Sequence, residues 1–355
     1  MILMRQLLPS RLYPGQARVG ASLQRLEYSP SLHVFNGVDW YWMPSLVRAL
    51  LFLFNERPTV VVCQWWSGTV LHSYLVLAMA ARILGARVVI EFHEVLDPGE
   101  AGLPFVGGYV RVVAPWLVRL ASAFVVHSSR DQALVEKHYR LATRPLVIPH
   151  GPYDHYGEYS CDGPPAAERI APAECCNLLF FGVIRPYKGL EDLLAVFEDL
   201  PEEEAKRYWL TVVGETWEGW ELPARLIARS RYRDRITFVN RYVHDDEVGA
   251  YFAAADAVVL PYRRASMSGP LHIGMASGLP VVVSDVGGHA EAVANYAGAV
   301  LVPPADLEAL HNALTEVVNM RGTRFTDPHS WEHISGLYDQ LFATLSQPSV
   351  ARETA

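Results

Sequence analysis

The chain has 355 residues, which at roughly 150 residues per domain corresponds to about two domains. Hydrophobic residues make up 51% and charged residues 19%, so a sizeable core can form, and disordered, collagen-like and coiled-coil classes are excluded. Thirty basic and 38 acidic residues give a net charge of −8, which argues against nucleic acid as a partner.

The four cysteines argue against a disulfide framework. Cys63, Cys161, Cys175 and Cys176 show no CxxC spacing, and Cys63 lies in an apolar run typical of a buried strand. No uninterrupted apolar segment reaches the roughly 18 residues of a membrane-spanning helix. The amino-terminal sequence MILMRQLLPSRLYPGQ is too polar and proline-rich for a signal peptide. We therefore expect a soluble, cytoplasmic protein.

Short β-branched runs recur along the chain, and most are apolar throughout, which is typical of strands covered on both faces. Stretches with helical spacing separate them, and this alternation predicts an α/β fold with doubly wound parallel sheets. The expected strands are residues 59–63, 88–92, 124–127, 146–149, 178–182, 210–214, 236–240, 257–261, 280–284 and 299–302. The expected helices include residues 71–84, 131–139, 190–200, 246–255 and 306–320.

One break in composition divides the sequence. Residues 151–177 are rich in Gly, Pro, Asp and Glu and lack periodicity, so we predict an interdomain linker there. This leaves an amino-terminal Rossmann-like domain over residues 1–150 and a carboxyl-terminal one over residues 178–328. Ligands of such folds bind outside the carboxyl ends of the strands, so we expect the site in the cleft between the domains.

The first informative motif is LLFFGVIRPYKGLEDLL, residues 178–194. A strand ends at Gly182, a short turn presents Arg185 and Lys188, and Gly189 opens a helix. Free N–H groups at a helix start, together with two nearby cations, suit a diphosphate. A plain turn with two solvated cations is the alternative.

The second motif is LPYRRASMSGPLHIGMASGLPVVVSDVGGHAEAV, residues 260–293. A strand runs into a loop, then a helix of small residues and another buried strand. Ser268 and Gly269 lie where a helix N-terminus would bind phosphate. The alternative is that Ser268 caps the helix without a ligand.

In this order and separation, GVIRPYKG and MASGLPVVVSDVGG resemble the carboxyl-terminal domain of GT-B glycosyltransferases, in the large retaining group related to glycogen and sucrose synthases (glycosyl transferases group 1). The resemblance extends to VVGETW, to FVNRYVHDDEVGAYFAAADAVVLPY and to SWEHISGLYDQLF. It is strong from about residue 178 to the end and weaker from about residue 32. In that family the tail helix crosses back to the first domain, which implies the same for residues 329–355.

The resemblance also implies individual roles in binding a nucleotide sugar. Arg185 and Lys188 resemble the pair that neutralises the donor diphosphate, and the backbone of residues 241–243 resembles the base-binding loop. Residues 266–271 resemble the loop and helix start that wrap the phosphates. The implied donor-binding residues are Gly182, Arg185, Lys188, Arg241, Tyr242, Val243, Ser266, Ser268, Gly269, Pro270 and Leu271.

On the acceptor side, VVIEFHEVLD places His93 at the end of a strand, where it resembles the family's histidine beside the transferred sugar. With Arg185 and Lys188, His93 completes the expected catalytic set. Trp65 and Trp66 follow the first clear strand and are expected to line the cleft, together with Glu94. His127 in FVVHSS and His150 in VIPHG also end strands, but a structural role is favoured for both.

Two features depart from the family pattern. Many members carry two glutamates, eight residues apart, that contact the sugar and the ribose, and the matching positions here are Ala265 and Ile273. The loop instead resembles a subset of the family with an S-x-S-G sequence. The start of the chain, with only Gly15 and Gly20 in a proline-containing stretch, does not match the strand and glycine-rich loop that open most members.

The aromatic cluster Trp40, Tyr41 and Trp42 precedes a strongly apolar stretch, WMPSLVRALLFLF. The favoured interpretation is a buried helix with its tryptophans in the core. The alternatives are an acceptor-sugar platform and an interfacial membrane anchor, because indole prefers the headgroup layer.

No DxD motif or histidine-rich cluster suggests a metal, and residues 245–246 fit a helix N-cap better. The family resemblance implies no metal and no cofactor. We therefore interpret the sequence as a cytoplasmic glycosyltransferase, with peripheral contact at the inner face of the membrane as an option. It would move a sugar from a UDP or GDP donor to a glycan or lipid-linked acceptor with retention. An inactive nucleotide- or glycan-binding module and a nucleotide-sugar isomerase or hydrolase are the alternatives.

Overall fold

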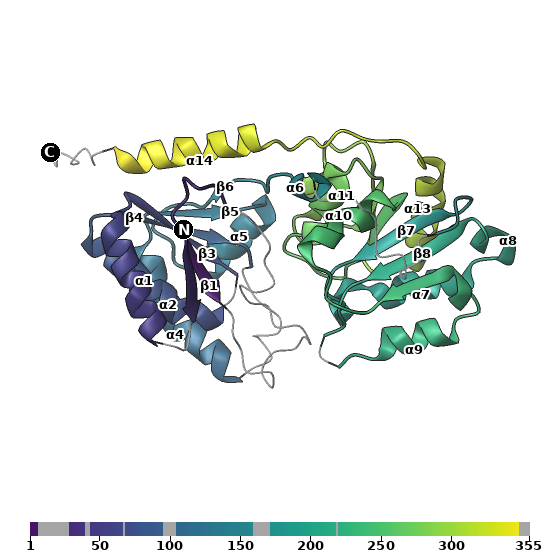
Figure 1. Ribbon diagram of the computed structural model, residues 1–355, viewed down its shortest axis with the longest axis horizontal. Coiled ribbons are helices and arrows are strands. Elements are labelled where there is room, and N and C mark those ends of the chain that lie inside the picture. Colours follow the sequence, from purple (N-terminus) through teal and green to yellow (C-terminus); the bar gives the residue numbers. More distant parts are fainter. Residues whose placement is uncertain are drawn as a thin grey trace. The chain divides into compact units, whose positions relative to one another are not determined.

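The computed structural model describes residues 1–5, 28–39, 43–66, 68–94, 104–158, 171–217 and 219–347. These residues form two compact units. Unit 1 comprises the described residues of 1–150 together with 331–347, and unit 2 comprises those of 151–330. Each unit has its own parallel sheet (Figure 1), so the predicted α/β class is confirmed.

The main sheet of unit 1 has the strand order β3-β4-β5-β6, all parallel. Alternate residues of β3 point to opposite faces: Val60 and Val62 pack in one core layer, and Cys63 and Trp65 in the other. A separate parallel pair, β1 with β2, was not expected from the sequence. The bounds are β1 (Ile2–Arg5), β2 (Phe35–Asp39), β3 (Val60–Trp65), β4 (Arg87–Phe92), β5 (Ala123–Val126) and β6 (Leu146–Val147).

Helices cover both faces of this sheet. On one face α1 packs beside α2, and α2 beside α4. On the other face α14 packs through Ile334 and Leu341, so this carboxyl-terminal helix belongs to the amino-terminal unit. The bounds are α1 (Met43–Glu56), η1 (Gly68–Val70), α2 (Leu71–Ile83), α4 (Pro104–Leu120), α5 (Ser129–His138) and α14 (Trp331–Ser346).

Unit 2 holds a six-stranded parallel sheet with the order β12-β11-β10-β7-β8-β9. The chain moves outward from β7 in one direction, then returns to β10 and moves outward in the other. The order therefore reverses between β7 and β10, and ligands of doubly wound sheets bind at such a point. The strands are β7 (Cys176–Phe181), β8 (Tyr208–Val213), β9 (Ile236–Val239), β10 (Ala257–Leu260), β11 (Val281–Ser284) and β12 (Ala299–Val302).

The helices of unit 2 follow the expected alternation with the strands. They are α6 (His155–Glu158), η2 (Pro186–Lys188), α7 (Leu190–Asp199), α8 (Glu202–Ala205), α9 (Leu222–Arg229), η3 (Arg233–Arg235), α10 (Asp245–Ala253), α11 (Gly269–Ala276), α12 (His289–Val293) and α13 (Leu307–Asn319). No helix of the described chain combines the length and apolar character needed to cross a bilayer.

The linker predicted over residues 151–177 is too long at both ends. Tyr153 and Tyr156 pack against the core of unit 2, α6 contacts α10, and β7 already begins at Cys176. Glycine and proline concealed this packing in the sequence, because they break the periodicity that marks a buried element.

Candidate functional site

The turn that follows β7 carries the two predicted cations. Gly182 adopts a φ of 112°, η2 presents Lys188, and Gly189 opens α7 with a φ of 65°. A Cβ on Gly189 would collide with the carbonyl oxygen of Pro261, so only glycine fits there. The turn predicted from the sequence is therefore present, and its backbone conformation requires glycine at position 189.

The two sequence motifs meet at Gly182. A Cβ built on Gly182 would lie 3.4 Å from Lys188 Nζ and 3.4 Å from Pro270 Cγ. Lys188 and the first turn of α11 thus approach the same glycine from segments far apart in the sequence. Ser268 caps α11, its side chain accepting from the backbone N–H of Leu271 at 3.4 Å. A cation and a helix N-terminus therefore lie together where the strand order reverses, which is an arrangement suited to phosphate.

Lys188 is positioned by an aromatic neighbour that sequence reasoning missed. Its Nζ donates to the Tyr262 hydroxyl at 3.1 Å and lies 4.7 Å from the centre of that ring. Burial disfavours the charged form, but the phenolic oxygens of Tyr262 and Tyr187 outweigh burial and raise the pKa of Lys188. Lys188 is therefore a cation held in place.

His289 is a second residue that sequence reasoning missed. Its ring lies 5.5 Å from that of Tyr262, and its Nδ1 lies 3.1 Å from the Ser284 carbonyl oxygen. Burial, with a smaller contribution from the charge of Lys188, lowers the pKa of His289 to about 4. A neutral imidazole therefore lies behind the cation. The sequence feature that could have indicated His289 is its position next to Gly287 and Gly288, shortly after a buried strand.

Arg185 lies against two aromatic rings. Its guanidinium carbon is 5.4 Å from the centre of Tyr187 and 5.7 Å from that of Trp217. Such cation–π contacts hold the guanidinium without neutralising its charge. The Arg185 charge also opposes protonation of Lys188, because the two cations are close.

The predicted base-binding loop is fixed by its own arginine. Arg241 pairs with Glu247, with Nη2 at 2.7 Å and Nη1 at 3.0 Å from the two carboxylate oxygens, and Nη1 donates to the Tyr242 carbonyl. The hydrogen bond from Arg241 lowers the pKa of Glu247. The Val243 side chain is buried. These contacts fix the loop backbone at the start of α10, while the Arg241 guanidinium is engaged within the protein.

At the two positions where many family members carry glutamate, the side chains are apolar. Ile273 is buried in the core of unit 2, and Ala265 packs against that core. The Leu271 side chain is also fully buried, and its backbone N–H donates to Ser268, so the structure gives Leu271 a place in the helix cap and the core. Ser266 accepts through its carbonyl from the N–H of Gly288 at 2.9 Å, which fixes the loop before α11.

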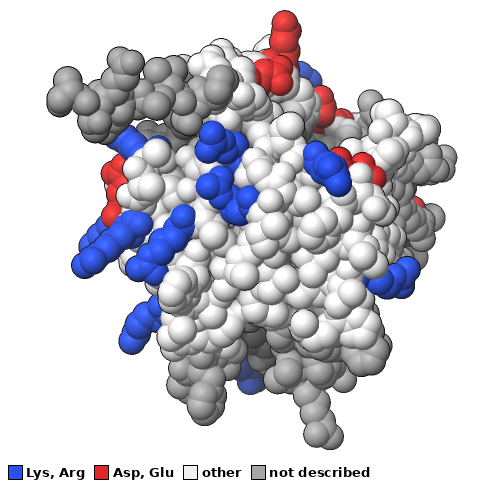
Figure 2. Space-filling view, turned by 90° about the vertical axis from the view of Figure 1, so that its left-hand side faces the viewer, with Lys and Arg blue, Asp and Glu red and all other residues white. Residues whose placement is uncertain are grey.

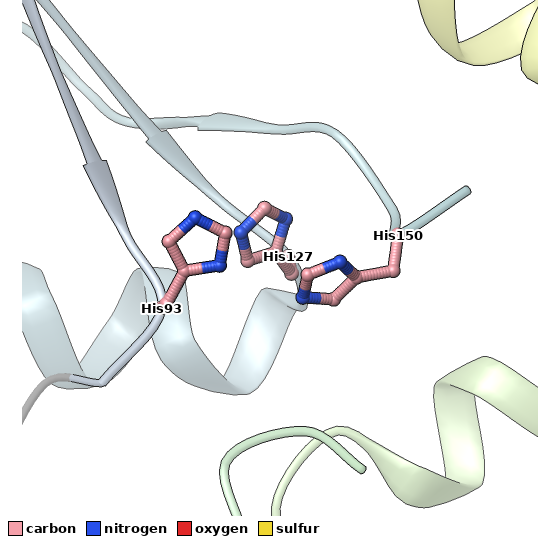
Figure 3. Close-up of side chains that lie close together, drawn as sticks. All are labelled: His93, His127 and His150. Atoms are coloured by element: carbon pink, nitrogen blue, oxygen red, sulfur yellow. The ribbon is translucent and has the colours of Figure 1, made fainter. Parts of the chain in front are cut away.

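Unit 1 gathers three histidines at the carboxyl ends of adjacent strands. His93 follows β4, His127 follows β5 and His150 comes shortly after β6 (Figure 3). Ring centres lie 4.7 Å apart for His93 and His127, 3.9 Å for His127 and His150, and 5.4 Å for His93 and His150. Sequence spacing did not indicate this cluster, because the parallel pairing of β4, β5 and β6 brings together residues that are distant in the sequence.

Burial keeps two of these imidazoles neutral. It lowers the pKa of His93 to about 3, with His127 adding to the shift, and it also lowers the pKa of His127. The Nδ1 of His127 lies 2.9 Å from the Ile148 carbonyl oxygen, which fixes Nδ1 as the donor and leaves Nε2 as an acceptor.

A buried carboxyl group lies beneath these rings. Glu91 Oε1 is 3.3 Å from His93 Nε2 and 3.5 Å from His127 Nε2, and it accepts from the Tyr338 hydroxyl at 2.8 Å. Burial raises the pKa of Glu91.

The histidine cluster is a group that could accept a metal ion. One ligand atom from each of His93, His127 and His150 lies within 4.8 Å of the others. Neutral imidazole is a zinc ligand, but zinc–nitrogen bonds of about 2.0–2.1 Å require these atoms to move closer together. As it stands, the cluster is a set of closely packed rings, in which His127 and His150 are stacked and His93 is tilted against both.

Of the predicted acceptor-side residues, Trp66 and Glu94 lie beside His93. Trp66 is 52% exposed and stacks on His93 at 4.1 Å between ring centres. Trp65 is 3% exposed and packs against Phe92, so its predicted place in the cleft is wrong. The backbone N–H groups of His93 and Glu94 both donate to the Trp65 carbonyl. Residues 40–42 lie outside the described residues.

The buried histidines make a prediction for stability. The pKa of His93 is about 3 in the folded protein against 6.5 for the free side chain, so below about pH 6.5 the unfolded chain takes up the proton first. The free energy of unfolding should therefore fall between about pH 6.5 and pH 4, at up to about 1.4 kcal/mol per pH unit for each such histidine. Denaturant titrations should show a flatter slope for His93→Gln than for the parent chain. The raised pKa of Glu91 changes the free energy of unfolding in the opposite direction, equally in the parent and the variant, so it does not affect the comparison. An unchanged slope in the variant would show that His93 takes up a proton within the folded protein.

The sequence was compared with known proteins. Residues 175–320 match the family Glycosyl transferases group 1. O-antigen chain mannosyltransferase B of Escherichia coli is 28% identical over 186 residues, 46% of this chain and 48% of the relative. GDP-mannose:glycolipid 4-beta-D-mannosyltransferase of Xanthomonas campestris is 34% identical over 107 residues, 30% of this chain and 29% of the relative. These matches span less than half of each relative's length.

Solved structures match over most of the chain. A sucrose-phosphate synthase from Thermosynechococcus elongatus has a TM-score of 0.65 at 19% identity, covering 97% of this chain and 89% of that one. Anabaena HepE, in complex with UDP and glucose, has a TM-score of 0.61 at 18% identity, covering 89% and 86%. At this level of identity the likeness shows the fold, and the expected GT-B architecture is confirmed.

Proposed function

Because residues 175–320 match the group 1 glycosyltransferases and the chain has the GT-B fold, we propose that it transfers a sugar from a nucleoside diphosphate donor to a glycan or lipid-linked acceptor. The observation that carries this proposal is the approach of Lys188 Nζ and Pro270 to Gly182 at the point where the strand order of unit 2 reverses.

Breaking the glycosidic bond builds negative charge on the departing diphosphate. Lys188, Arg185 and the first turn of α11 supply fixed positive charge and dipoles to that group, so they bind the transition state better than the ground state. For transfer with retention, the acceptor hydroxyl attacks from the side of the departing diphosphate, and a diphosphate oxygen takes its proton. The protein then mainly stabilises charge and positions the reactants.

On the acceptor side we assign Trp66, His93 and Glu94. The exposed Trp66 ring offers a flat apolar surface to a sugar, and the neutral imidazole of His93 offers one donor and one acceptor. A glycolipid acceptor is named for the Xanthomonas relative, which supports a lipid-linked acceptor. With such an acceptor, the protein would act in the cytoplasm at the inner face of the membrane.

The donor nucleotide is UDP or GDP, and the reaction needs no metal. GDP-mannose is named for one relative and UDP is bound in one structural neighbour. Two cations and a helix N-terminus supply the charge that a metal would otherwise contribute.

A thermal-shift panel of UDP, GDP and their sugars tests this proposal. A nucleotide present at a hundredfold excess over its Kd should add roughly 2.7 kcal/mol to stability. Donor turnover, with and without acceptor, is then followed in the presence of EDTA. Stabilisation without turnover would identify an inactive binding module. Donor breakdown without acceptor would identify a hydrolase or isomerase, and loss of activity with EDTA would point to a metal in the histidine cluster.

A further inference from the structure

The outer side of α1 in unit 1 is apolar. Met43, Val47, Leu51 and Phe54 recur at every third or fourth position and form one stripe along the helix. Their side chains are 43–60% exposed. The opposite side of α1 is buried in the core through Leu46 and Leu53, among others, so this helix has two apolar sides and only one of them is covered by the described residues.

The exposed apolar surface continues onto the neighbouring helices. Met79 and Ile83 lie exposed on α2, and Val112 and Trp116 on α4. Because α1 packs beside α2, and α2 beside α4, the outward sides of the three helices form one surface. Half of the exposed large apolar side chains of the described residues lie on these helices. A contiguous exposed patch of this kind marks an interaction site, whereas isolated apolar residues do not.

Unit 2 provides an internal comparison. Its described residues expose only Leu226, Leu301 and Leu307 among large apolar side chains, on α9, β12 and α13. Unit 2 is the larger of the two units, yet its exposed apolar residues are scattered. The apolar surface is therefore a property of one face of unit 1 and not of the protein surface in general.

Arginines accompany this surface. Arg48, Arg82, Arg111 and Arg119 are exposed on the same helices, while α1, α2 and α4 contain no Asp and one Glu, Glu56 at the end of α1. Glu56 is paired with His33 at 3.0 Å. Figure 2 views the side on which these helices lie in Figure 1, and basic side chains stand on a mainly uncharged surface with few acidic ones. A chain of net charge −8 thus presents a basic face here.

We propose that this apolar–arginine face, formed by the eight apolar residues and four arginines above, docks on an anionic membrane surface. The apolar side chains would enter the headgroup layer, and the arginines would contact lipid phosphates. Trp116 suits that layer, and the Arg119 guanidinium lies 5.3 Å from its ring centre. The proposal deepens the proposed function, because it brings the protein to the surface that presents a lipid-linked acceptor.

Charge favours the membrane over a second copy of the chain. In a symmetric dimer the face would pack against itself, and four arginines of each copy would meet those of the other, with Glu56, already paired with His33, as the one carboxylate on these helices. An anionic lipid layer instead supplies negative charge to all four arginines and an apolar interior to the side chains between them.

Flotation with phosphatidylcholine vesicles, and with equimolar phosphatidylcholine and phosphatidylglycerol, tests the proposal directly. We expect flotation only with the anionic vesicles, weakening as salt is added. Arg48→Gln/Leu51→Gln should lower the apparent binding constant by roughly tenfold or more. Trp116→Ala/Arg119→Gln, a double substitution on α4, should lower the apparent binding constant by a similar factor. Arg225→Gln/Leu226→Gln, which changes an exposed pair on α9, is the matched control and should float like the parent.

Thermal unfolding and nucleotide-induced stabilisation establish that each variant is folded. Absence of parent binding to anionic vesicles, or equal loss in the α9 control, would overturn the docking face. A dimer in solution that both face variants dissociate would assign the face to a second copy. Turnover of a water-soluble acceptor by the parent chain is measured separately. A parent chain that floats with anionic vesicles but shows no turnover refutes the transferase, and one that turns over the acceptor but does not float refutes the docking.

Discussion

Lys188→Met is expected to lower turnover by about 10²- to 10³-fold, or roughly 3–4 kcal/mol, because it removes a preorganised cation from the leaving diphosphate. Methionine has an unbranched stem of similar length, so it removes the ammonium group, with its charge and its hydrogen bond to Tyr262, at little change in shape. Arg185→Ala should cause a loss of the same order. Steady-state kinetics with saturating donor measures both effects.

The position of Lys188 sharpens the controls. The sequence placed it in a surface turn, but it is half-buried, and its ammonium group is held by the Tyr262 hydroxyl at 3.1 Å. Lys188→Arg should therefore rescue only partly, since a planar fork does not replace a point charge. Tyr262→Phe keeps the ring and should cost less than Lys188→Met. If transfer were robust and survived both Lys188→Met and Arg185→Ala, the diphosphate assignment would be wrong.

The strands were predictable because most are buried on both faces. All ten expected runs overlap strands of the structure, including the buried β7 and β10 between which the order reverses. In an alternating α/β pattern, apolar β-branched runs of this length are rarely anything other than buried strands. The meeting of the two motifs at Gly182 then follows from the adjacency of β7 and β10, which the sequence implied only through the family resemblance.

Side-chain direction was harder to predict. Trp65 and Trp66 are neighbours, and neighbouring residues at a strand end point to different sides, so both could not line one cleft. Trp65 turns into the core, and Trp66 stacks on His93. The alternation of side chains along a strand would have predicted that only one of the two tryptophans lines the cleft.

The two apolar sides of α1 could not be separated from the sequence. Leu46 and Leu53 are buried whereas Val47 and Leu51 are exposed, yet all four are equally apolar. The sequence favoured a buried helix, and only the packing of α1 beside α2 shows which side remains uncovered. The histidine cluster was hidden for a related reason, because strand pairing and not sequence spacing brings its members together.

His93→Gln is expected to lower turnover by about a hundredfold while leaving nucleotide affinity within a few fold, as for loss of one fixed hydrogen-bond donor. His93 belongs to unit 1, whereas the predicted diphosphate residues belong to unit 2, so its loss leaves the nucleotide site intact. Thermal shifts with UDP and GDP report affinity, and kinetics with acceptor report turnover. His138→Gln, an exposed histidine of the same unit, is the matched control.

The pH dependence separates a catalytic role of His93 from a structural one. Because burial lowers the pKa of His93 to about 3, the imidazole stays neutral throughout the working range and contributes no inflection to the kcat profile above about pH 5. It then acts by donating a hydrogen bond and not by transferring a proton. Trp66→Ala removes the ring stacked on His93 and should reproduce part of the loss without changing the shape of the profile. Unchanged turnover in a folded His93→Gln variant would instead return His93 to the packing of the histidine cluster, where His127 and Glu91 hold it.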